Sequence, residues 1–318
     1  MRALRLNDSS ALVEEDISQP SPGPGEVLVR VHAAGVTATE LRWYPTLHAK
    51  SGGQRSHAVP GHEFSGVVAA SGEGVTGFEA GQEVYGMNDW YSDGALAEFC
   101  ITQPAYIAPK PRNLTHAQAA AVPIGGLTAW QGLFDRARLQ RGERVLVHGG
   151  AGGVGVFAVQ LARFRGAHVI ATASARNRDF VSQLGAEQVI DYRAARFDER
   201  LREIDVVFDT VGGETLERSW SVLKPGGRMI TIVSGAENSA DDRVKQAFFI
   251  VAPNQAQLGE IGNLIEAGHL RPVVDAVVPF ENAAAAYAGQ IRQRQGLGKM
   301  VVAIVPMRTS TGFQRTSA

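Results

Sequence analysis

The sequence predicts an α/β protein in which a doubly wound parallel sheet is joined to a smaller all-β domain. From about residue 145, short apolar strands alternate with helices, which is typical of a parallel sheet covered on both faces. Before about residue 110, short valine-rich segments are separated by glycine, proline and serine, and no helical period persists. At 318 residues, the chain is long enough for each domain to bury its own core.

The first 110 residues are expected to form a small barrel or sandwich. The candidate strands are 26–36, 64–70 and 82–86, with turn-forming sequences such as SPGPGE between them. From Thr115 the composition changes to an alanine-rich stretch over 115–137. We expect this stretch to be helical, with Thr115 as its N-cap.

The parallel sheet is expected to take its strands from the middle of the chain. They are 145–149, 168–173, 188–192, 206–210 and 228–233, with a sixth candidate at 248–252 before a helix at 255–268. Two further strands, 273–280 and 298–305, flank an alanine-rich helix and are expected to return to the first domain. This gives a first domain over 1–117, a nucleotide-binding domain over 118–268 and a returning segment over 269–318. The polar end, 307–318, is expected to be frayed.

A glycine motif after the first strand of this sheet predicts a dinucleotide site. Gly150, Gly152 and Gly155 have the spacing G-x-G-x-x-G, and an apolar helix is expected over about 156–165. In this pattern the first glycine permits a tight turn, the second lets the backbone approach a pyrophosphate, and the third lets helix and strand pack closely. The expected pyrophosphate contacts are Gly150, Ala151, Gly152, Gly153, Val154 and Gly155.

The second strand of the sheet favours NADPH over NADH. Sites that prefer NAD carry an acidic residue at the end of this strand, where it binds the ribose 2′-hydroxyl. Here no acid occurs before Asp179, and the segment offers Ser174, Arg176 and Arg178 instead. A hydroxyl and guanidinium groups suit a 2′-phosphate, and Tyr192 after the third strand is a further candidate contact.

Composition excludes several classes of protein. A net charge of −1 gives no support for nucleic-acid or membrane-surface binding. The single cysteine, Cys100, cannot form an intrachain disulfide or a cysteine-rich zinc site. The N-terminal residues lack an apolar signal segment, and no apolar run approaches about 20 residues, so we expect a cytoplasmic protein.

Further motifs run across nearly the whole chain. They are PGHEFSGVV (60–68), LTAWQGLF (127–134), GAEQVIDYR (185–193), VVFDTVGG (206–213), LKPGGR (223–228) and LRPVVD (270–275). With the glycine motif, they resemble the medium-chain dehydrogenase/reductase superfamily, and within it the zinc-independent quinone oxidoreductase branch related to zeta-crystallin. The resemblance implies a chaperonin-10-like β-barrel substrate domain and a Rossmann domain, with substrate and nicotinamide meeting between them, often in a homodimer.

The same resemblance implies further cofactor contacts at the ends of later strands. These are Thr210, Val211, Val233, Phe249 and Val251, together with Lys299, which lies where relatives approach the phosphates.

The resemblance also bears on the binding of zinc. Zinc-dependent members have a cysteine ligand where this chain has Thr37. The chain keeps His62 and Glu63, but its single cysteine, Cys100, is not at a zinc-ligand position. Without a thiolate we expect no zinc, and a structural hydrogen-bonding role for His62.

Without a metal to polarise a carbonyl, hydride from NADPH requires an acceptor that is already electron-poor. Quinones, enones and enoyl compounds meet this condition. Tyr44 and Thr37 are the candidates for proton delivery, Trp43 for stacking on a planar acceptor, and Thr128 for a position near the nicotinamide. Each of these residues also suits an ordinary packing or capping role. The alternatives are a relative of the zinc alcohol dehydrogenases and a non-catalytic NADPH-binding protein of the crystallin type.

Overall fold

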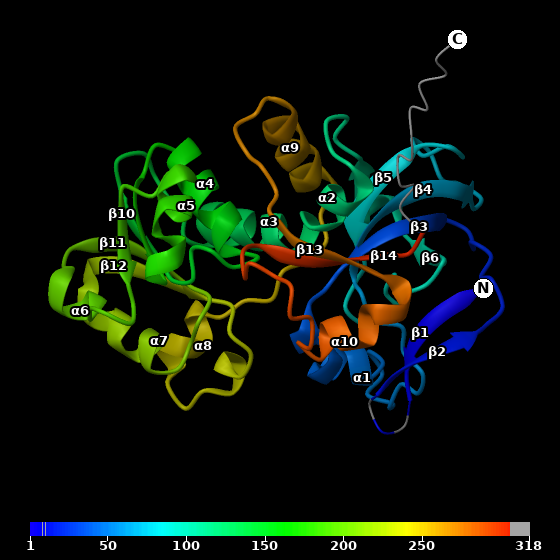
Figure 1. Ribbon diagram of the computed structural model, residues 1–318, viewed down its shortest axis with the longest axis horizontal. Helices are drawn as coiled ribbons and strands as arrows, with labels where there is room; N and C mark the ends of the chain where they lie inside the picture. The colour runs from blue at the N-terminus through cyan, green and yellow to red at the C-terminus, as the bar shows by residue number, and fades with distance from the viewer. Residues whose placement is uncertain (8, 10, 306–318) are drawn as a thin grey trace, which may run out of the picture.

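The computed structural model describes residues 1–7, 9 and 11–305, and the frayed end expected over 307–318 lies outside them. Figure 1 shows two lobes, each built on its own sheet, with the last described strand lying in the lobe that holds the N-terminus. The predicted fold class is confirmed, because one sheet is parallel and flanked by helices and the other is a barrel-like β-sheet.

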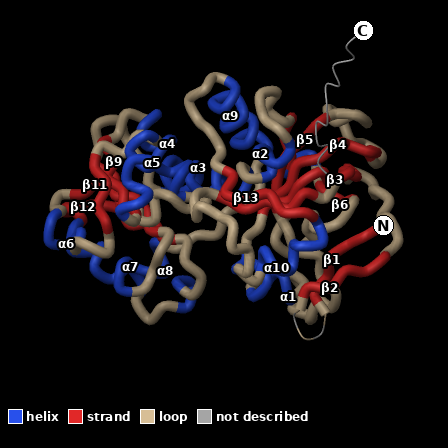
Figure 2. Tube along the Cα trace, in the orientation of Figure 1, coloured by secondary structure: helices blue, strands red, loops and turns tan. Residues whose placement is uncertain are grey.

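The lobe that does not hold the N-terminus, which we call the first lobe, contains a five-stranded parallel sheet in the order β10-β9-β8-β11-β12. Its strands are β8 (Arg144–Val147), β9 (His168–Ala173), β10 (Gln188–Asp191), β11 (Ile204–Asp209) and β12 (Leu223–Thr231). Its helices are α4 (Gly155–Phe164), α5 (Arg178–Gln183), α6 (Phe197–Arg200), α7 (Glu214–Ser219) and α8 (Asp242–Ala247). Figure 2 shows α4 and α5 on one side of the sheet and α7 and α8 on the other. The strand order reverses between β8 and β11, which is where doubly wound sheets bind their ligands.

The second lobe contains a seven-stranded sheet in the order β13-β14-β3-β4-β5-β7, with β6 also paired to β3. Its strands are β3 (Val27–Gly35), β4 (Glu63–Ser71), β5 (Glu83–Met87), β6 (Phe99–Thr102), β7 (Ile107–Pro109), β13 (Val274–Pro279) and β14 (Lys299–Ala303). The last strand, β14, runs antiparallel to β3, with Val302 opposite Ala34. After forming the parallel sheet, the chain therefore returns to the seven-stranded sheet of the second lobe. The domain boundaries at residues 117 and 268 stay predictions.

Smaller elements complete the second lobe and the connections. They are the hairpin of β1 (Arg2–Leu6) and β2 (Leu12–Asp16), α1 (Tyr44–Leu47), α10 (Ala283–Tyr287), and the single turns η1 (Ala38–Arg42), η2 (Pro104–Tyr106), η4 (Ala175–Asn177), η5 (Trp220–Val222), η6 (Ala236–Asn238) and η7 (Phe280–Asn282). No helix among the described residues has the length and apolar character needed to cross a membrane.

The alanine-rich stretch 115–137 is helical but not continuous. It forms α2 (His116–Ala120), α3 (Pro123–Trp130) and a π-helical turn, η3 (Gln131–Arg136). Thr115 caps α2 as expected, because its hydroxyl accepts from the Gln118 amide and the Gln118 side chain accepts in return. The break falls before Pro123, which lacks an amide hydrogen and therefore begins a helix more readily than it continues one.

The sixth strand expected at 248–252 is wrong. Only an isolated bridge joins Phe248 to Thr231, and the segment continues without strand pairing to α9 (Gln255–Glu266). Its backbone groups bind side chains instead: the Val251 carbonyl accepts from the Trp90 indole at 2.9 Å, and the Ala252 amide donates to Gln131 at 3.1 Å. The segment is therefore held against the second lobe instead of extending the parallel sheet.

Candidate active site

The glycine loop lies at the carboxyl end of β8, where the sheet order reverses. The positive φ of +72° that makes the turn belongs to Gly149, so assigning the tight turn to Gly150 is wrong. Gly150 has a packing role, because a Cβ there would lie 3.0 Å from the Cβ of Ala171 on β9, which is closer than ordinary van der Waals contact. At Gly155 a Cβ would lie 2.1 Å from the Gly149 carbonyl oxygen, so only glycine lets α4 begin this close to the turn.

A cavity of about 380 Å³ and one of about 610 Å³ occur in the described part of the chain, and the larger one adjoins the glycine loop. Six of the predicted cofactor contacts line this larger cavity, which we call the nucleotide pocket: Ala151, Gly152, Ser174, Tyr192, Thr210 and Val211. Ser174 is buried, whereas Tyr192 and Val211 expose about half of their surface. The pocket therefore brings together the ends of β8, β9, β10 and β11.

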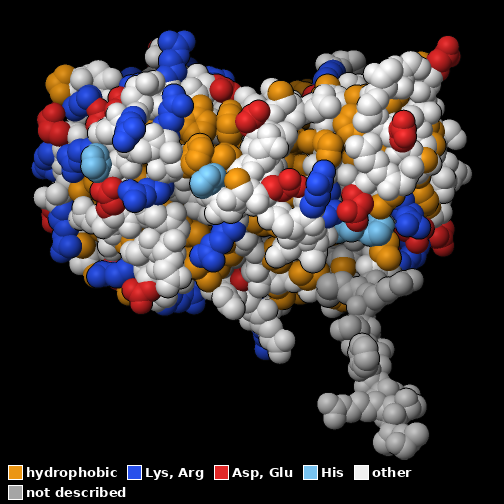
Figure 3. All heavy atoms as spheres, turned by 90° about the horizontal axis from the view of Figure 1, so that it is seen from above, with side chains coloured by type: hydrophobic (Ala, Val, Ile, Leu, Met, Phe, Trp, Pro, Cys, Tyr) orange, Lys and Arg blue, Asp and Glu red, His pale blue; other side chains and the backbone are white. Residues whose placement is uncertain are grey.

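The nucleotide pocket is basic. Four arginines line it, Arg176, Arg193, Arg196 and Arg218, and its lining includes no aspartate or glutamate. Arg196 and Arg218 pair with carboxylates, each at 2.7 Å, whereas no ion pair is recorded between Arg176 or Arg193 and the described residues. In the view of Figure 3, Lys and Arg side chains are more numerous over the lobe with the parallel sheet. Exposed guanidinium groups without a carboxylate suit a phosphate.

The other predicted cofactor residues lie outside the lining of this pocket. Arg178 is exposed at the first position of α5, and Gly150, Gly153, Val154 and Gly155 belong to the loop and the start of α4. Val233 follows β12, and Phe249 and Val251 are buried in the segment after α8. At β11, the buried Asp209 accepts hydrogen bonds from the amides of Val211 and Gly212, which shapes the turn that carries Thr210 into the pocket.

Two of the three predicted catalytic residues are joined by a chain of polar contacts. The Lys299 ammonium donates to the Thr37 hydroxyl at 2.9 Å and contacts the Glu63 carboxylate at 2.5 Å. The other oxygen of Glu63 accepts from the Ile124 amide at 2.9 Å. One turn further along α3, the Thr128 hydroxyl donates to the Ile124 carbonyl at 2.6 Å. Lys299, expected at the phosphates, therefore connects the end of β3 to the start of α3.

The third predicted catalytic residue, Tyr44, lies apart from this chain. Its side chain is 55% exposed and stacks on His48, with ring centroids 4.0 Å apart. Its neighbour Trp43 packs edge-on against Trp90 at 4.6 Å between centroids. Both residues belong to the segment 37–58, on the side of the second lobe where Figure 1 shows α1 beside α10.

A second buried cluster contains His62, whose hydrogen-bonding role was predicted, together with Glu40 and Tyr287, which were not predicted from the sequence. Glu40 is fully buried and accepts from the Tyr287 hydroxyl at 2.6 Å, from the Gly61 amide at 3.1 Å, and contacts the His62 ring nitrogen Nδ1. Burial, together with the nearby carboxylate of Glu40, raises the pKa of the Tyr287 hydroxyl well above its usual value. Burial likewise raises the pKa of Glu63, although the Lys299 ammonium opposes this shift.

Two family models match the chain: one described as an alcohol dehydrogenase GroES-like domain over residues 23–112, and one described as a zinc-binding dehydrogenase over 184–302. A human protein named NAD(P)H oxidoreductase RTN4IP1, mitochondrial, is 31% identical, and the match covers 89% of this chain and 82% of that protein. The chain belongs to the medium-chain dehydrogenase/reductase superfamily. It is an oxidoreductase of the kind that uses NAD(P)H.

Other members of the superfamily are similar over the same length. A tomato (Solanum lycopersicum) 2-methylene-furan-3-one reductase is 31% identical, with 92% of this chain and 76% of that protein covered, and a rat (Rattus norvegicus) quinone oxidoreductase is 29% identical, with 95% and 97% covered. The solved structure of a quinone oxidoreductase from Coxiella burnetii superposes with a TM-score of 0.85 at 28% identity, covering 96% of this chain and 99% of that one. A structure titled NAD-dependent alcohol dehydrogenase gives 0.82 at 29% identity, covering 96% and 100%.

The name of the second family model raises the question of zinc, and the donor set here does not fit the metal. Thr37 offers a hydroxyl that already accepts from Lys299, and the Glu63 carboxylate is paired with the same ammonium. His62 is fully buried, and its two ring nitrogens contact Glu40 and the Ser92 carbonyl. A tetrahedral zinc site needs free thiolate, imidazole or carboxylate ligands, and here an ammonium lies among the candidates.

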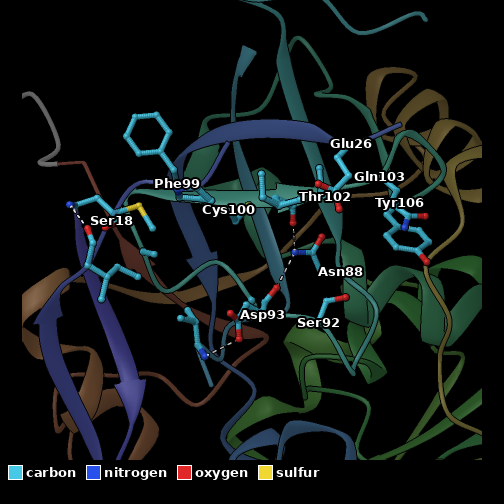
Figure 4. A pocket seen from close by; sticks show the side chains of 17 residues that line it. Ser18, Glu26, Asn88, Ser92, Asp93, Phe99, Cys100, Thr102, Gln103 and Tyr106 are labelled. Atoms are coloured by element: carbon cyan, nitrogen blue, oxygen red, sulfur yellow. Dashed lines mark hydrogen bonds between the residues drawn. The ribbon is translucent and has the colours of Figure 1, made fainter. Parts of the chain in front are cut away.

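The smaller cavity lies on another part of the second lobe, and none of the predicted cofactor or catalytic residues lines it (Figure 4). Asn88 lines this cavity, and its side-chain amide donates to the backbone carbonyls of Asp93 and Ile101, both at 2.9 Å. Burial raises the pKa of the Cys100 thiol there, so this cysteine is not activated as a nucleophile.

Proposed function

We propose that this protein is an NADPH-dependent reductase that transfers hydride to quinones or to other activated alkenes without the help of zinc. The proposed class of acceptor is supported by the position of the Lys299 ammonium, which lies between Thr37 and Glu63. With that pair formed, the positions that hold zinc in alcohol dehydrogenases have no free ligand set to activate an alcohol or an isolated ketone.

The preference for NADPH is supported by the nucleotide pocket. Arg176 and Arg193 line it without recorded carboxylate partners, and the buried Ser174 ends the adjacent strand. These groups suit a 2′-phosphate, whereas an NAD-preferring site would present an acid to the ribose hydroxyl. When bound, the cofactor supplies the hydride, and the chain supplies binding, orientation and a proton. Arg178, Tyr192, Val233, Phe249 and Val251 are proposed as further cofactor contacts, and Tyr44, Thr37 and Thr128 as candidate catalytic residues.

We also propose a homodimer located in the cytoplasm. The support for a dimer is membership of the medium-chain dehydrogenase/reductase superfamily, whose members are often dimeric. Several similar proteins are named as mitochondrial, so fractionation of cells that express the full chain is the test of location.

The test of the proposed activity is the rate of NADPH oxidation by purified protein treated with EDTA. The acceptors are a benzoquinone, an enone and, as a control, a saturated aldehyde, with NADH assayed in parallel. We expect the quinone or the enone to be reduced, the saturated aldehyde to be left unchanged, and NADPH to be preferred. Activity that is lost to EDTA and restored by zinc would contradict the proposal. Tight NADPH binding without oxidation by any acceptor would favour the non-catalytic alternative.

A further inference from the structure

The position of Lys299 is fixed from two sides. The amide of the preceding Gly298 donates to the Ala151 carbonyl in the glycine loop at 2.8 Å, and the Lys299 amide donates to the Val273 carbonyl at 2.9 Å. Gly298 has a φ of +66°, and a Cβ there would lie 2.1 Å from the Val273 oxygen, so glycine is required at this position. Lys299 therefore extends from the cofactor loop to the second lobe with little freedom to move.

The Lys299 ammonium has a buried counter-charge in Glu63. Lys299 is 9% exposed and Glu63 is fully buried. An ammonium that gave up its proton would leave the buried Glu63 carboxylate without its counter-charge, so recovery of that proton is favoured. The remaining ionisable groups of this region, Glu40, His62 and Tyr287, are hydrogen-bonded to one another behind Thr37.

Of the two side chains that the Lys299 ammonium contacts, Thr37 is the more exposed, because Glu63 is fully buried. The Thr37 side chain is half-buried, and its hydroxyl oxygen accepts from Lys299. Across residues 1–7, 9 and 11–305, no acceptor is recorded for the hydroxyl's own hydrogen. A hydroxyl that accepts from an ammonium while its hydrogen is free is arranged to donate to a bound molecule, and the ammonium makes it a better donor.

We propose that Thr37 is the proton donor of the reduction and that Lys299 supplies the proton through it. This inference rests on the proposed function. After hydride reaches the β-carbon of an enone, the Thr37 O–H bond breaks and a C–H bond forms at the α-carbon. In the same step a proton passes from Lys299 Nζ to the Thr37 oxygen. Lys299 regains a proton from water before the next turnover. One hydride and one proton are consumed for each alkene reduced. Thr37 is then the catalytic residue and Lys299 a positioning residue that acts through it.

The experiment uses an α-substituted enone, NADPH and D₂O, and it measures the configuration of the deuterium at the α-carbon of the product. Protonation by a fixed hydroxyl gives one configuration, whereas protonation by bulk water gives a mixture. The variants are Thr37→Val, which keeps the shape without the hydroxyl, Thr37→Ser, which restores it, and the double variant Glu63→Gln/Lys299→Met. The double variant removes both charges of the buried pair, so that neither is left unpaired.

We expect one configuration from the native protein and from Thr37→Ser, and a mixture from Thr37→Val and from the double variant. We also expect kcat to fall by at least about tenfold in these two variants. Their Kd for NADPH, measured by fluorescence titration, is expected to change by less than about threefold. Lys245→Met, at an exposed lysine of α8, serves as the control and keeps the native result.

Unchanged α-deuteration in both Thr37→Val and the double variant would overturn the proposal while leaving the proposed function intact. A large loss of NADPH affinity in the double variant with unchanged deuteration would instead assign Lys299 to the cofactor phosphates. Mixed configurations from the native protein would exclude a fixed donor. If the native protein reduced no enone or quinone at all, the proposed function would fall, and the proton relay with it.

Discussion

His148 is buried at the end of β8, immediately before the turn of the glycine loop. Its Nε2 lies 2.9 Å from the Ser219 hydroxyl, which itself donates to the Thr215 carbonyl, so we assign the ring hydrogen to Nε2. Nδ1 lies 3.2 Å from the Thr172 hydroxyl and then acts as the acceptor. Burial lowers the pKa of His148 to about 3, so the ring is neutral in the folded protein.

A pH-dependent loss of stability follows from this ring. Between the unfolded pKa of about 6.5 and the folded pKa of about 3, the unfolded chain binds a proton at His148 that the folded chain does not. The free energy of unfolding therefore falls as the pH drops through this window, by at most about 1.4 kcal/mol per pH unit from this group. Urea titrations at several pH values should show a shallower fall in His148→Gln. Equal slopes in the variant and the native protein would contradict this account.

Substitution of Arg176 tests whether the nucleotide pocket prefers NADPH to NADH. Arg176 lines the nucleotide pocket, and no carboxylate partner is recorded for it in the part of the chain that the structure describes. Loss of a charged hydrogen bond to phosphate costs about 1.5–3 kcal/mol, so Arg176→Ala should weaken NADPH binding by about tenfold or more and leave NADH binding nearly unchanged.

The matched control for Arg176 is Arg200→Ala, an exposed arginine at the end of α6 that lies outside the nucleotide pocket. Fluorescence titration with both cofactors measures the two affinities. An equal loss for NADPH and NADH in Arg176→Ala would place this side chain away from the 2′-phosphate.

At the scale of single residues, the sequence was informative where a motif limits the chemistry. The glycine spacing predicted the loop, and the missing acid after the second strand drew attention to Ser174 and Arg176, which both line the nucleotide pocket. Arg193 and Arg218 were missed because they come from a loop and a helix whose placement depends on tertiary packing. Glu40 and Tyr287 are 247 residues apart in sequence, so no local pattern indicated their contact.

Among the secondary-structure elements, the close approach of α4 to the turn at Gly149 depends on Gly155. In Gly155→Ala, the Cβ would lie 2.1 Å from a backbone oxygen, so either the loop or the helix must shift. We expect a loss of about 1–3 kcal/mol in stability and a clear loss of NADPH affinity. Thermal denaturation with and without NADPH measures both effects.

The control for this prediction is Gly259→Ala in α9. A Cβ there meets nothing within 4 Å, and the residue lies inside a helix. Alanine is favoured over glycine in a helix by about 0.5–1 kcal/mol, so this variant should be as stable as the native protein or more so. Gly155→Ala with native stability and native NADPH binding would contradict the close-packing argument.

Element prediction succeeded where hydrophobic period and local caps agree, and it failed where tertiary contacts decide. The five parallel strands and the Thr115 cap follow from local sequence. The segment 248–252 has the composition of a strand, but its backbone groups bind the side chains of Trp90 and Gln131. Those partners lie more than 100 residues away in sequence, and composition alone gives no sign of them.

For the whole molecule, one buried hydrophobic cluster joins the two sheets, and each lobe has a further cluster of its own. Tyr85 and Trp90 of the second lobe pack in the same buried cluster as Val147 and Phe208 of the parallel sheet. Hydrogen bonds reinforce this junction, because the Tyr85 hydroxyl donates to the Leu258 carbonyl at 2.6 Å. We therefore expect the lobes to unfold together, in a single calorimetric transition.

Tyr85→Phe tests this cooperativity. It leaves the Leu258 carbonyl without its tyrosine donor and should lower the midpoint of the whole transition, at a cost of about 1–3 kcal/mol. Tyr106→Phe, at a half-buried tyrosine near the smaller cavity, is the control and should leave the midpoint unchanged. Two separate transitions, or a shift confined to one part of the melting curve, would contradict cooperative unfolding through the shared cluster.

The central claim is that hydride passes from NADPH to the β-carbon of an activated alkene, and isotopic transfer tests it most directly. The enzyme is given an enone with NADPH deuterated at the nicotinamide C4, each diastereomer in turn, and the product is analysed by mass spectrometry and NMR. We predict one deuterium at the β-carbon from one of the two diastereomers and a saturated ketone as product. Deuterium at the carbonyl carbon, with an allylic alcohol as product, would show that the protein acts as a carbonyl reductase and would contradict the account.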